Sequence, residues 1–343
     1  MPDFLLYGPT GYTGELIARA AVEQGLRPRL AGRDPVRLRR LADKLELDHA
    51  VAPLDDAAAL DAALAGLPLV LHCAGPFRLT HQPMADACLR NRAHYLDLAG
   101  EIGVVEALAA RDAEARAAGV VLLPGVGFDF VPTDCLANQL LPRLPDATHL
   151  SIAVQHLPWR DDHGRPHQPT ASRGTLATLF DSQLAGGVVR RNGVLTREPL
   201  AARARRIDLG AGPVVATAFP LGEVAALYHS TGVPNVDAHV VLPPAARLAL
   251  RYLGPRLRHL PLRRLLPRTG PSPAELAHSR SLVWAELRSP DARVETARLE
   301  TENPYAFTVR SALAAVRRLI GSAPERGFQT PSSLTDTFDA LMR

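Results

Sequence analysis

Three glycines near the start of the sequence have a spacing that suits the binding of a phosphate group. Gly8, Gly11 and Gly14 follow one another at three-residue intervals in MPDFLLYGPTGYTG. Gly8 would permit a tight turn, Gly11 would let an anion approach backbone N–H groups, and Gly14 would allow the next helix to pack closely. The pattern GxxGxxG is a variant of the dinucleotide-binding GxGxxG. The alternative is a glycine-rich turn that binds nothing.

The elements around the glycines favour dinucleotide binding. Phe4–Tyr7 has the length and apolarity of a buried parallel strand, and residues 15–24 continue at helical spacing until Gly25. Strand, glycine turn and helix together form the unit that holds a pyrophosphate. The residues predicted to contact it are Gly8, Thr10, Gly11, Tyr12, Thr13 and Gly14.

A second short strand is predicted at 28–33, and it ends where the ribose of adenosine is recognised. An acidic residue there hydrogen-bonds the 2′-hydroxyl of NAD, whereas an arginine pairs with the 2′-phosphate of NADP. Arg33 therefore predicts NADP(H) rather than NAD(H). Asp34 comes directly after Arg33 and leaves NAD(H) as an alternative cofactor. The alternative role for Arg33 itself is that of a solvated charge at the end of the strand.

A third strand at 50–52 leads to a pair of acidic residues, Asp55 and Asp56. Asp55 is placed to contact the adenine amino group of the cofactor. The alternative is that the pair caps the helix expected at 57–64.

A fourth strand, at 67–72, runs into a loop at the carboxyl edge of the expected sheet. Ligands of open α/β sheets bind at that edge. We therefore expect the nicotinamide side of the cofactor to be lined by Cys73, Ala74, Gly75, Pro76, Phe77 and Gly100. Cys73 is more typical of a small packing residue than of a nucleophile.

Titratable residues near the strand ends are candidates for proton transfer. Nicotinamide supplies the hydride, so the protein has to position the acceptor and supply a proton or stabilise charge. Asp129 and Glu101 are the first candidates, followed by Asp97, His94, Tyr95 and His72. For each of them the alternative is a structural role, in a helix cap or in a bond to a loop backbone.

Strands and helices alternate over the first 140 or so residues, which predicts a doubly wound parallel sheet. Beyond Pro145 the pattern changes to strands at 147–156, 214–219, 236–242, 281–288 and 293–300, with a hairpin turn at 289–292 and a helix at 174–185. The fold class predicted is α/β: a Rossmann-type sheet plus an α+β domain whose sheet is mostly antiparallel. The expected domains are 1–130, 131–326 and a C-terminal helix in 327–343. Thr133 or Asp134 is expected to cap the helix that ends near Leu141.

The composition excludes several classes of function. Lys44 is the only lysine and lies on a solvated helix face, so a catalytic lysine is not expected. Cys73, Cys88 and Cys135 are widely spaced and lack a CxxC, which predicts neither disulfides nor a metal site. A net charge of +4, from 39 basic and 35 acidic residues, does not indicate nucleic acid binding. Without a signal peptide or a transmembrane run, the prediction is a cytoplasmic protein.

Residues 243–268 combine seven arginines with leucines and prolines. Such a segment could lie on an anionic membrane or on a carrier protein. A basic flap over the substrate cavity is the alternative, because prolines at 255, 261 and 267 interrupt a long amphipathic helix.

Several motifs together resemble the saccharopine dehydrogenase-like oxidoreductase family, especially its trans-acting enoyl reductase branch. They are GPTGYTG, AGR, HCAGPF, HYLDLAGE at 94–101, PGVGFDFVPTD, SRGTLATL, GPSPAE, NPYAFT and GFQTPSS. The resemblance implies an NAD(P)-binding Rossmann domain, a second domain that shapes the substrate pocket and often the dimer contact, and a terminal helix that packs back on the Rossmann domain.

The function predicted from these observations is an NADPH-dependent reductase, expected as a homodimer. It is expected to reduce an activated C=C (enoyl) or C=N bond, and its substrate is expected to be a small or lipid-like metabolite that carries this bond. The alternative is an NADP(H)-binding scaffold or sensor without turnover, which the lack of a Tyr-x-x-x-Lys pair leaves open.

Overall fold

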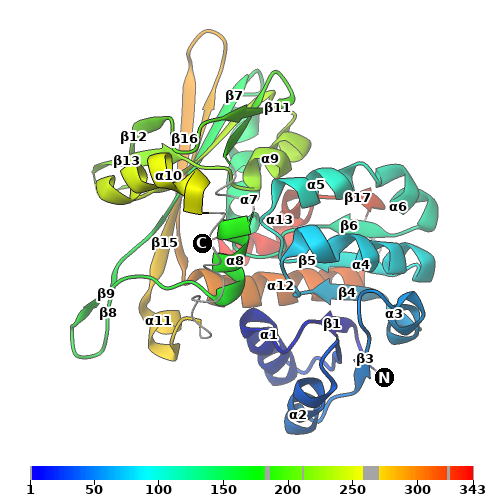
Figure 1. The fold of residues 1–343 in the computed structure, drawn as a ribbon. Coiled ribbons are helices and arrows are strands. Elements are labelled where there is room, and N and C mark those ends of the chain that lie inside the picture. Colours follow the sequence, from blue (N-terminus) through cyan, green and yellow to red (C-terminus); the bar gives the residue numbers. More distant parts are fainter. Residues whose placement is uncertain (1, 182–185, 211, 258–269, 323–324, 343) are drawn as a thin grey trace. The chain divides into compact units, whose positions relative to one another are not determined.

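The computed structural model describes residues 2–181, 186–210, 212–257, 270–322 and 325–342, which divide into two compact units (Figure 1). Unit 1 consists of Met1–Ala99, Gly103–Phe128 and Thr308–Leu341. Unit 2 consists of Gly100–Ile102, Asp129–Phe307 and Met342–Arg343.

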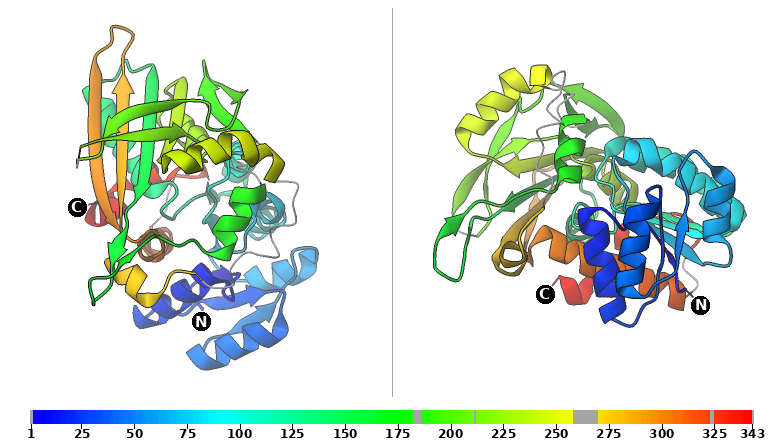
Figure 2. Two further views of the ribbon diagram at one scale, coloured as in Figure 1. Left: turned by 60° about the vertical axis from the view of Figure 1, so that its left-hand side comes forward. Right: turned by 60° about the horizontal axis from the view of Figure 1, so that its bottom comes forward.

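Unit 1 is built on a seven-stranded sheet in the order β17-β6-β5-β4-β1-β2-β3, and every pair in it is parallel. The strands are β1 (Leu5–Tyr7), β2 (Arg29–Gly32), β3 (His49–Val51), β4 (Leu69–His72), β5 (His94–Asp97), β6 (Val121–Leu123) and β17 (Gly327–Phe328). The helices are α1 (Tyr12–Glu23), α2 (Pro35–Leu45), α3 (Ala57–Leu64), α4 (Phe77–Asn91), α5 (Ile102–Ala109), α6 (Asp112–Ala118) and most of α12 (Pro304–Gly321). Figures 1 and 2 show helices on both sides of this sheet.

The central strands of unit 1 are buried on both faces, which is why they read as continuous apolar runs. Leu5, Leu6, Val70 and Leu71 are all 0% exposed. The strand order reverses between β1 and β4, and ligands of doubly wound sheets bind in the crevice at such a reversal. The sheet therefore places the loops after β1 and β4 at the expected ligand position.

The chain returns to the parallel sheet near its carboxyl end. The Gly327 N–H donates to the Val120 carbonyl at 2.9 Å, and the Phe328 N–H donates to Asp112 at 2.8 Å. The sequence predicted only an extended entry here, because two residues are too few for a strand pattern. Beyond β17 lie η4 (Pro331–Leu334), α13 (Thr335–Phe338) and η5 (Asp339–Leu341). Residues 308–326, expected within the second domain, group with unit 1.

Unit 2 contains an eight-stranded sheet in the order β11-β10-β14-β7-β15-β16, with β13 paired to β14 and β12 to β13. The pairs are antiparallel except for β7 and β14, so the predicted fold class is confirmed. The strands are β7 (His149–His156), β10 (Gly187–Arg191), β11 (Val194–Glu198), β12 (Ala204–Asp208), β13 (Pro213–Ala218), β14 (Asn235–Val241), β15 (Arg280–Arg288) and β16 (Val294–Glu302). A separate hairpin joins β8 (Trp159–Arg160) to β9 (Pro166–His167).

The helices of unit 2 are α7 (Val131–Leu140) with the turn η1 (Leu141–Arg143), α8 (Arg173–Asp181), α9 (Glu223–Thr231), α10 (Pro244–Leu257) and α11 (Pro273–His278). The predicted cap of α7 is wrong. Phe130 occupies the N-cap position without a side-chain bond, and Thr133 and Asp134 lie inside the helix. Thr133 instead donates its hydroxyl to the Phe130 carbonyl at 3.1 Å.

The hairpin of β10 and β11 was not predicted, although the sequence carries a signal for it. Asn192 and Gly193 both have positive φ, 48° and 79°, and they join strands paired from Arg191 to Val194. Two residues of this type are the common two-residue hairpin turn. By contrast, the predicted turn at 289–292 is confirmed by a bond from the Ala292 N–H to the Ser289 carbonyl at 3.1 Å.

Candidate functional site

The glycine loop, Gly8–Gly14, contains two glycines that packing requires and one that faces open space. A Cβ on Gly8, whose φ is +82°, would lie 2.8 Å from the Cβ of Ala74. A Cβ on Gly14 would lie 2.4 Å from the Gly8 carbonyl oxygen, whereas one on Gly11 would meet only that oxygen, at 3.6 Å. Gly8 and Gly14 are therefore fixed by the fold, and Gly11 leaves room where a ligand would approach.

The backbone at the start of α1 is arranged to receive an anion. Gly11 is the N-cap residue, its backbone is extended, and no side chain caps the helix. The first N–H groups of an uncapped helix carry a partial positive charge. This region thus has the geometry of a phosphate-binding helix start.

Two arginines lie around the glycine loop, and the acidic residue between them has a structural role. Asp34 caps α2 by accepting from the N–H groups of Val36 and Arg37 at 3.1 Å each. Its carboxylate is thus engaged, which removes the reason to favour NAD(H). Arg33 is exposed, and Arg37, which was not predicted as a site residue, donates to the Thr10 carbonyl at 2.5 Å. Arg37 lies on α2 whereas Arg33 precedes that helix, so helical spacing gave no signal for Arg37.

The two acidic residues after β3 have different roles. Asp56 caps α3 by accepting from the Ala59 N–H at 2.9 Å, as the structural alternative proposed. Asp55 is exposed and lines a cavity of about 420 Å³ together with Arg78 and Leu79. Its contact with adenine stays a prediction.

The segment 73–77 comes after β4 and touches the glycine loop. The Cys73 N–H donates to the Tyr7 carbonyl at 2.8 Å, and Ala74 packs at Gly8. Burial raises the pKa of the Cys73 thiol, so it stays protonated and is a poor nucleophile. Gly75, Pro76 and Phe77 complete the segment, with Phe77 as the first residue of α4.

Three of the other titratable candidates hold the core of unit 1. Asp97, fully buried, accepts from the Tyr95 hydroxyl at 2.7 Å and from the N–H groups of Ala99 and Gly125 at 2.9 and 2.8 Å. His94 accepts from the Val121 N–H at 3.1 Å. These bonds join β5 to β6 and to the loop after β6, so the three side chains have structural roles.

His72 is also a core residue. Its ring lies 5.4 Å from the rings of both Tyr7 and Phe77, and its Nε2 lies 3.0 Å from the Thr80 hydroxyl. Burial lowers the pKa of His72 to about 3, so the ring is neutral at physiological pH. A neutral ring of this kind cannot serve as a proton donor in the imidazolium form.

The two carboxylates proposed for proton transfer both lie in unit 2. A Cβ on Gly100 would lie 2.5 Å from Oδ2 of Asp129, so only glycine at position 100 leaves room for that carboxylate. Asp129 is exposed, yet the protein around it removes enough hydration to raise its pKa to about 6. Glu101 is 5% exposed. Asp129 does not cap α7, whose N-cap residue, Phe130, lacks a side-chain bond.

A third carboxyl group of unit 2, that of Glu223, was not identified as a candidate from the sequence. Glu223 is 4% exposed at the start of α9, and burial followed by the charge of Asp129 raises its pKa well above the usual value. No motif surrounds Glu223, so only the fold could reveal it.

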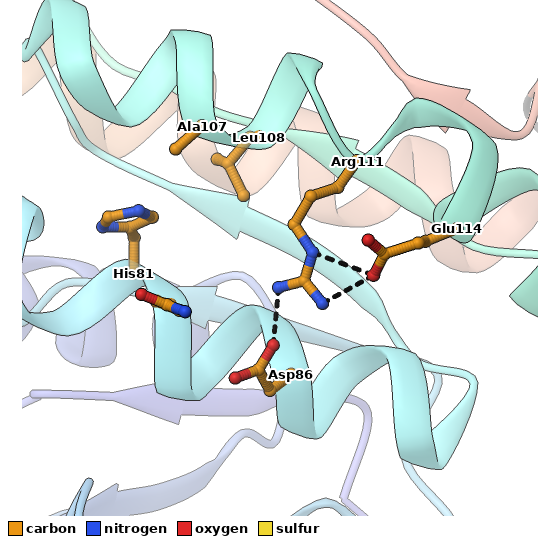
Figure 3. Close-up of a pocket in the computed structure, with 7 residues that line it drawn as sticks. His81, Asp86, Ala107, Leu108, Arg111 and Glu114 are labelled. Atoms are coloured by element: carbon orange, nitrogen blue, oxygen red, sulfur yellow. Dashed lines mark hydrogen bonds and ion pairs between the residues drawn. The ribbon is translucent and has the colours of Figure 1, made fainter.

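A separate cavity of about 350 Å³ in unit 1 has no unpaired charge to offer a ligand (Figure 3). Its arginine, Arg111, bonds Asp86 at 2.6 Å and Glu114 at 2.8 Å. Across the described ranges, no group of three or more His, Cys, Asp or Glu residues is arranged to hold a metal ion. In the same residues, no helix has the length and apolarity to cross a membrane.

Comparisons with known proteins agree with this geometry. Residues 4–123 match the family model of the saccharopine dehydrogenase NADP binding domain. A trans-acting enoyl reductase of Mycobacterium leprae is 33% identical over 150 residues, which cover 41% of this chain and 36% of the relative. A human saccharopine dehydrogenase-like oxidoreductase is 26% identical over 150 residues, covering 38% and 35%. These matches thus span only about a third of the relatives' length.

A solved structure shares the fold over nearly the whole chain. It is the apo saccharopine dehydrogenase (L-Glu forming) of Saccharomyces cerevisiae, with a TM-score of 0.64 and 13% identity, over 98% of this chain and 96% of the other. Over residues 4–123 the family model confirms the resemblance inferred from the motifs, and the cofactor that it names is the predicted NADP(H). Residues 4–123 of this chain are therefore similar to the saccharopine dehydrogenase NADP-binding domain.

Proposed function

We propose that the protein is an NADPH-dependent oxidoreductase that reduces an activated C=C (enoyl) or C=N bond of a small or lipid-like metabolite. The observation that carries the proposal is the glycine loop, where Gly11 is open between two tightly packed glycines. The names of the relatives, enoyl reductase and saccharopine dehydrogenase-like oxidoreductase, support a reductase.

In this proposal each part of the chain has one task. The glycine loop and the start of α1 hold the pyrophosphate, and Arg33, with Arg37 beside it, holds the 2′-phosphate. Asp55, the segment 73–77 and Gly100 contact the rest of the cofactor. Bound NADPH supplies a hydride, and the protein supplies the proton.

Asp129 is the proposed proton donor, and Glu101 is the second candidate. Asp129 is exposed, so a substrate can reach it, and its pKa of about 6 lies near neutral pH, where a carboxyl can both hold and release a proton. Glu101 is nearly buried, which limits direct contact with a substrate.

Arg33→Ala should remove most of the preference for NADPH over NADH. A charge-assisted contact with the 2′-phosphate is worth about 1.5 to 3 kcal/mol, and NADH lacks that phosphate. Calorimetric titration of both cofactors measures the preference. Arg39→Ala, which removes an exposed arginine of α2, is the matched control and should leave the preference unchanged. Equal affinity of the unmodified protein for the two cofactors would disprove the assignment of Arg33.

The alternative is an NADP(H)-binding scaffold or sensor without turnover. It shares the cofactor site but does not need Asp129. Oxidation of NADPH that depends on an added enoyl thioester or imine distinguishes the two functions.

We also propose that α10 docks on an anionic lipid surface. Leu248, Tyr252 and Leu253 are 62%, 58% and 50% exposed on this helix, next to Arg251. The sequence has no acidic residue between Asp237 and Glu275, so the segment complements a negative surface. Residues 258–268 of the predicted 243–268 segment lie outside the described residues.

Replacing Leu248 and Tyr252 by serine should weaken binding to phosphatidylserine vesicles by at least about tenfold, because two apolar side chains no longer enter the interface. Vesicle sedimentation measures this, and Val36→Ser, at an exposed residue of unit 1, is the control. Equal binding to neutral vesicles, or to an acyl carrier protein instead, would reject the lipid surface.

We also propose that the protein is a homodimer, which sedimentation tests, and that it is located in the cytoplasm, which cell fractionation tests.

A further inference from the structure

A side chain of helix α2 contacts the backbone of the glycine loop. Arg37 is the third residue of α2, and its guanidinium donates to the Thr10 carbonyl at 2.5 Å. The backbone of Arg37 is fixed as well, because its N–H donates at 3.1 Å to Asp34, the residue that caps α2. The next residue, Leu38, is 1% exposed. The guanidinium therefore extends to the loop from an anchored turn of helix.

Two hydrogen bonds fix the peptide unit between Thr10 and Gly11. Its carbonyl accepts from Arg37, and its N–H, which belongs to Gly11, donates to the Gly8 carbonyl at 3.3 Å. The peptide bond is trans, so its C=O and N–H groups point in opposite directions. Bonds to both groups therefore set the orientation of the peptide plane.

This peptide unit lies in the part of the loop that packing leaves loose. Gly8 is fixed by Ala74 and by a bond from its N–H to the Ala31 carbonyl at 2.8 Å, and Gly14 packs against Gly8. Gly11, by contrast, would meet only one atom if it carried a Cβ. A glycine with so few neighbours can adopt many backbone conformations. The bond from Arg37 restricts that freedom.

The orientation of this peptide plane matters for the start of α1. Gly11 is the N-cap residue, and the first bond inside the helix runs from the Glu15 N–H to the Gly11 carbonyl at 2.9 Å. The N–H groups of residues 12–14 come before that bond, and such groups are the ones that bind a phosphate. Their direction follows from the conformation at Gly11.

We propose that Arg37 is a positioning residue for the cofactor: its bond to the Thr10 carbonyl holds the glycine loop in the conformation that binds a pyrophosphate. This rests on the proposed binding of NADPH at the loop. A loop that is already ordered loses less conformational entropy when the ligand binds. The pyrophosphate is common to NADPH and NADH, so this role differs from that of Arg33, which concerns the 2′-phosphate of NADPH alone.

NADH distinguishes the two roles, because it has the pyrophosphate and lacks the 2′-phosphate. Arg37→Ala should weaken the binding of NADH by about fivefold, the effect of losing one ordinary hydrogen bond. Arg33→Ala should leave the affinity for NADH unchanged. Calorimetric titration measures both affinities. Unchanged binding of NADH in Arg37→Ala would overturn the proposal.

Two further variants separate positioning from the loss of a positive charge. Arg40→Ala removes an exposed arginine from the next turn of α2 and should leave the affinity for NADH unchanged. Arg37→Lys keeps the charge and a donor, so it should bind NADH more tightly than Arg37→Ala. If Arg40→Ala loses as much affinity as Arg37→Ala, charge alone explains the effect and positioning is rejected.

Amide hydrogen exchange tests the same bond without any cofactor. In Arg37→Ala the N–H of Gly11 should exchange about fivefold faster than in the wild type, because the peptide plane is released. The N–H of Gly8, bonded to the Ala31 carbonyl, is the internal reference and should exchange at an unchanged rate. Equal exchange at Gly11 in both proteins would reject positioning. If the wild type binds neither NADPH nor NADH, the proposed function fails, while the exchange rates still decide whether Arg37 orders the loop.

Discussion

Gly11→Val should weaken NADPH binding by a factor on the order of 100 or more and leave the protein folded. The added side chain has room within the protein, since a Cβ at this position meets only the Gly8 carbonyl oxygen, at 3.6 Å. It would fill the space through which a pyrophosphate reaches the start of α1. Calorimetry measures the loss of affinity, and thermal unfolding checks the fold.

Gly14→Ala is the matched comparison in the same loop. Its Cβ would lie 2.4 Å from the Gly8 carbonyl oxygen, a distance that forces the backbone to move. This variant should therefore unfold at a lower temperature, whereas Gly11→Val should not. If Gly11→Val keeps its affinity for NADPH, the glycine loop is not the pyrophosphate site.

Asp129→Asn should lower kcat by about 100-fold or more and leave the affinity for NADPH nearly unchanged. Asparagine keeps the shape next to Gly100 but cannot supply the proton. Stopped-flow measurement of NADPH oxidation gives kcat, and titration gives the affinity. Normal turnover in this variant would remove Asp129 as the donor and leave Glu101 as the candidate.

The same variant has a predictable effect on stability. The pKa of Asp129 rises from its usual value of 3.8 to about 6 on folding, so its stabilising contribution is complete below about pH 3.8 and is lost as the pH rises through about 6. Relative to the wild type, Asp129→Asn should thus gain thermal stability above about pH 6. A helix-capping Asp129 would give a loss instead, but α7 has no such cap.

The elements that could be predicted from the sequence are those with a local signal. Phe4–Tyr7 reads as a buried strand because parallel strands are covered on both faces, and the three glycines mark the turn after it. β17 lacked such a signal, since its two residues become a strand only by pairing with β6. The hairpin at Asn192 and Gly193 had a signal in its two turn residues, but it was not predicted.

For the candidate site, residue types alone could not separate function from structure. Asp97 and Asp129 look alike in the sequence, but Asp97 accepts three hydrogen bonds in the core of unit 1 and Asp129 is exposed. Glu223 could not be identified, because its electrostatic interaction with Asp129 arises from the fold between residues 94 positions apart (223 − 129). Such contacts between distant residues have no local pattern.

The proposed function depends above all on the binding of NADPH at the glycine loop and on its use as the reductant. Calorimetric titration of the folded wild-type protein with NADPH and with NADH is the decisive experiment. We expect saturable binding of one NADPH per chain, tighter than that of NADH, and the loss of this binding in Gly11→Val. A folded protein that binds neither cofactor would contradict the proposal.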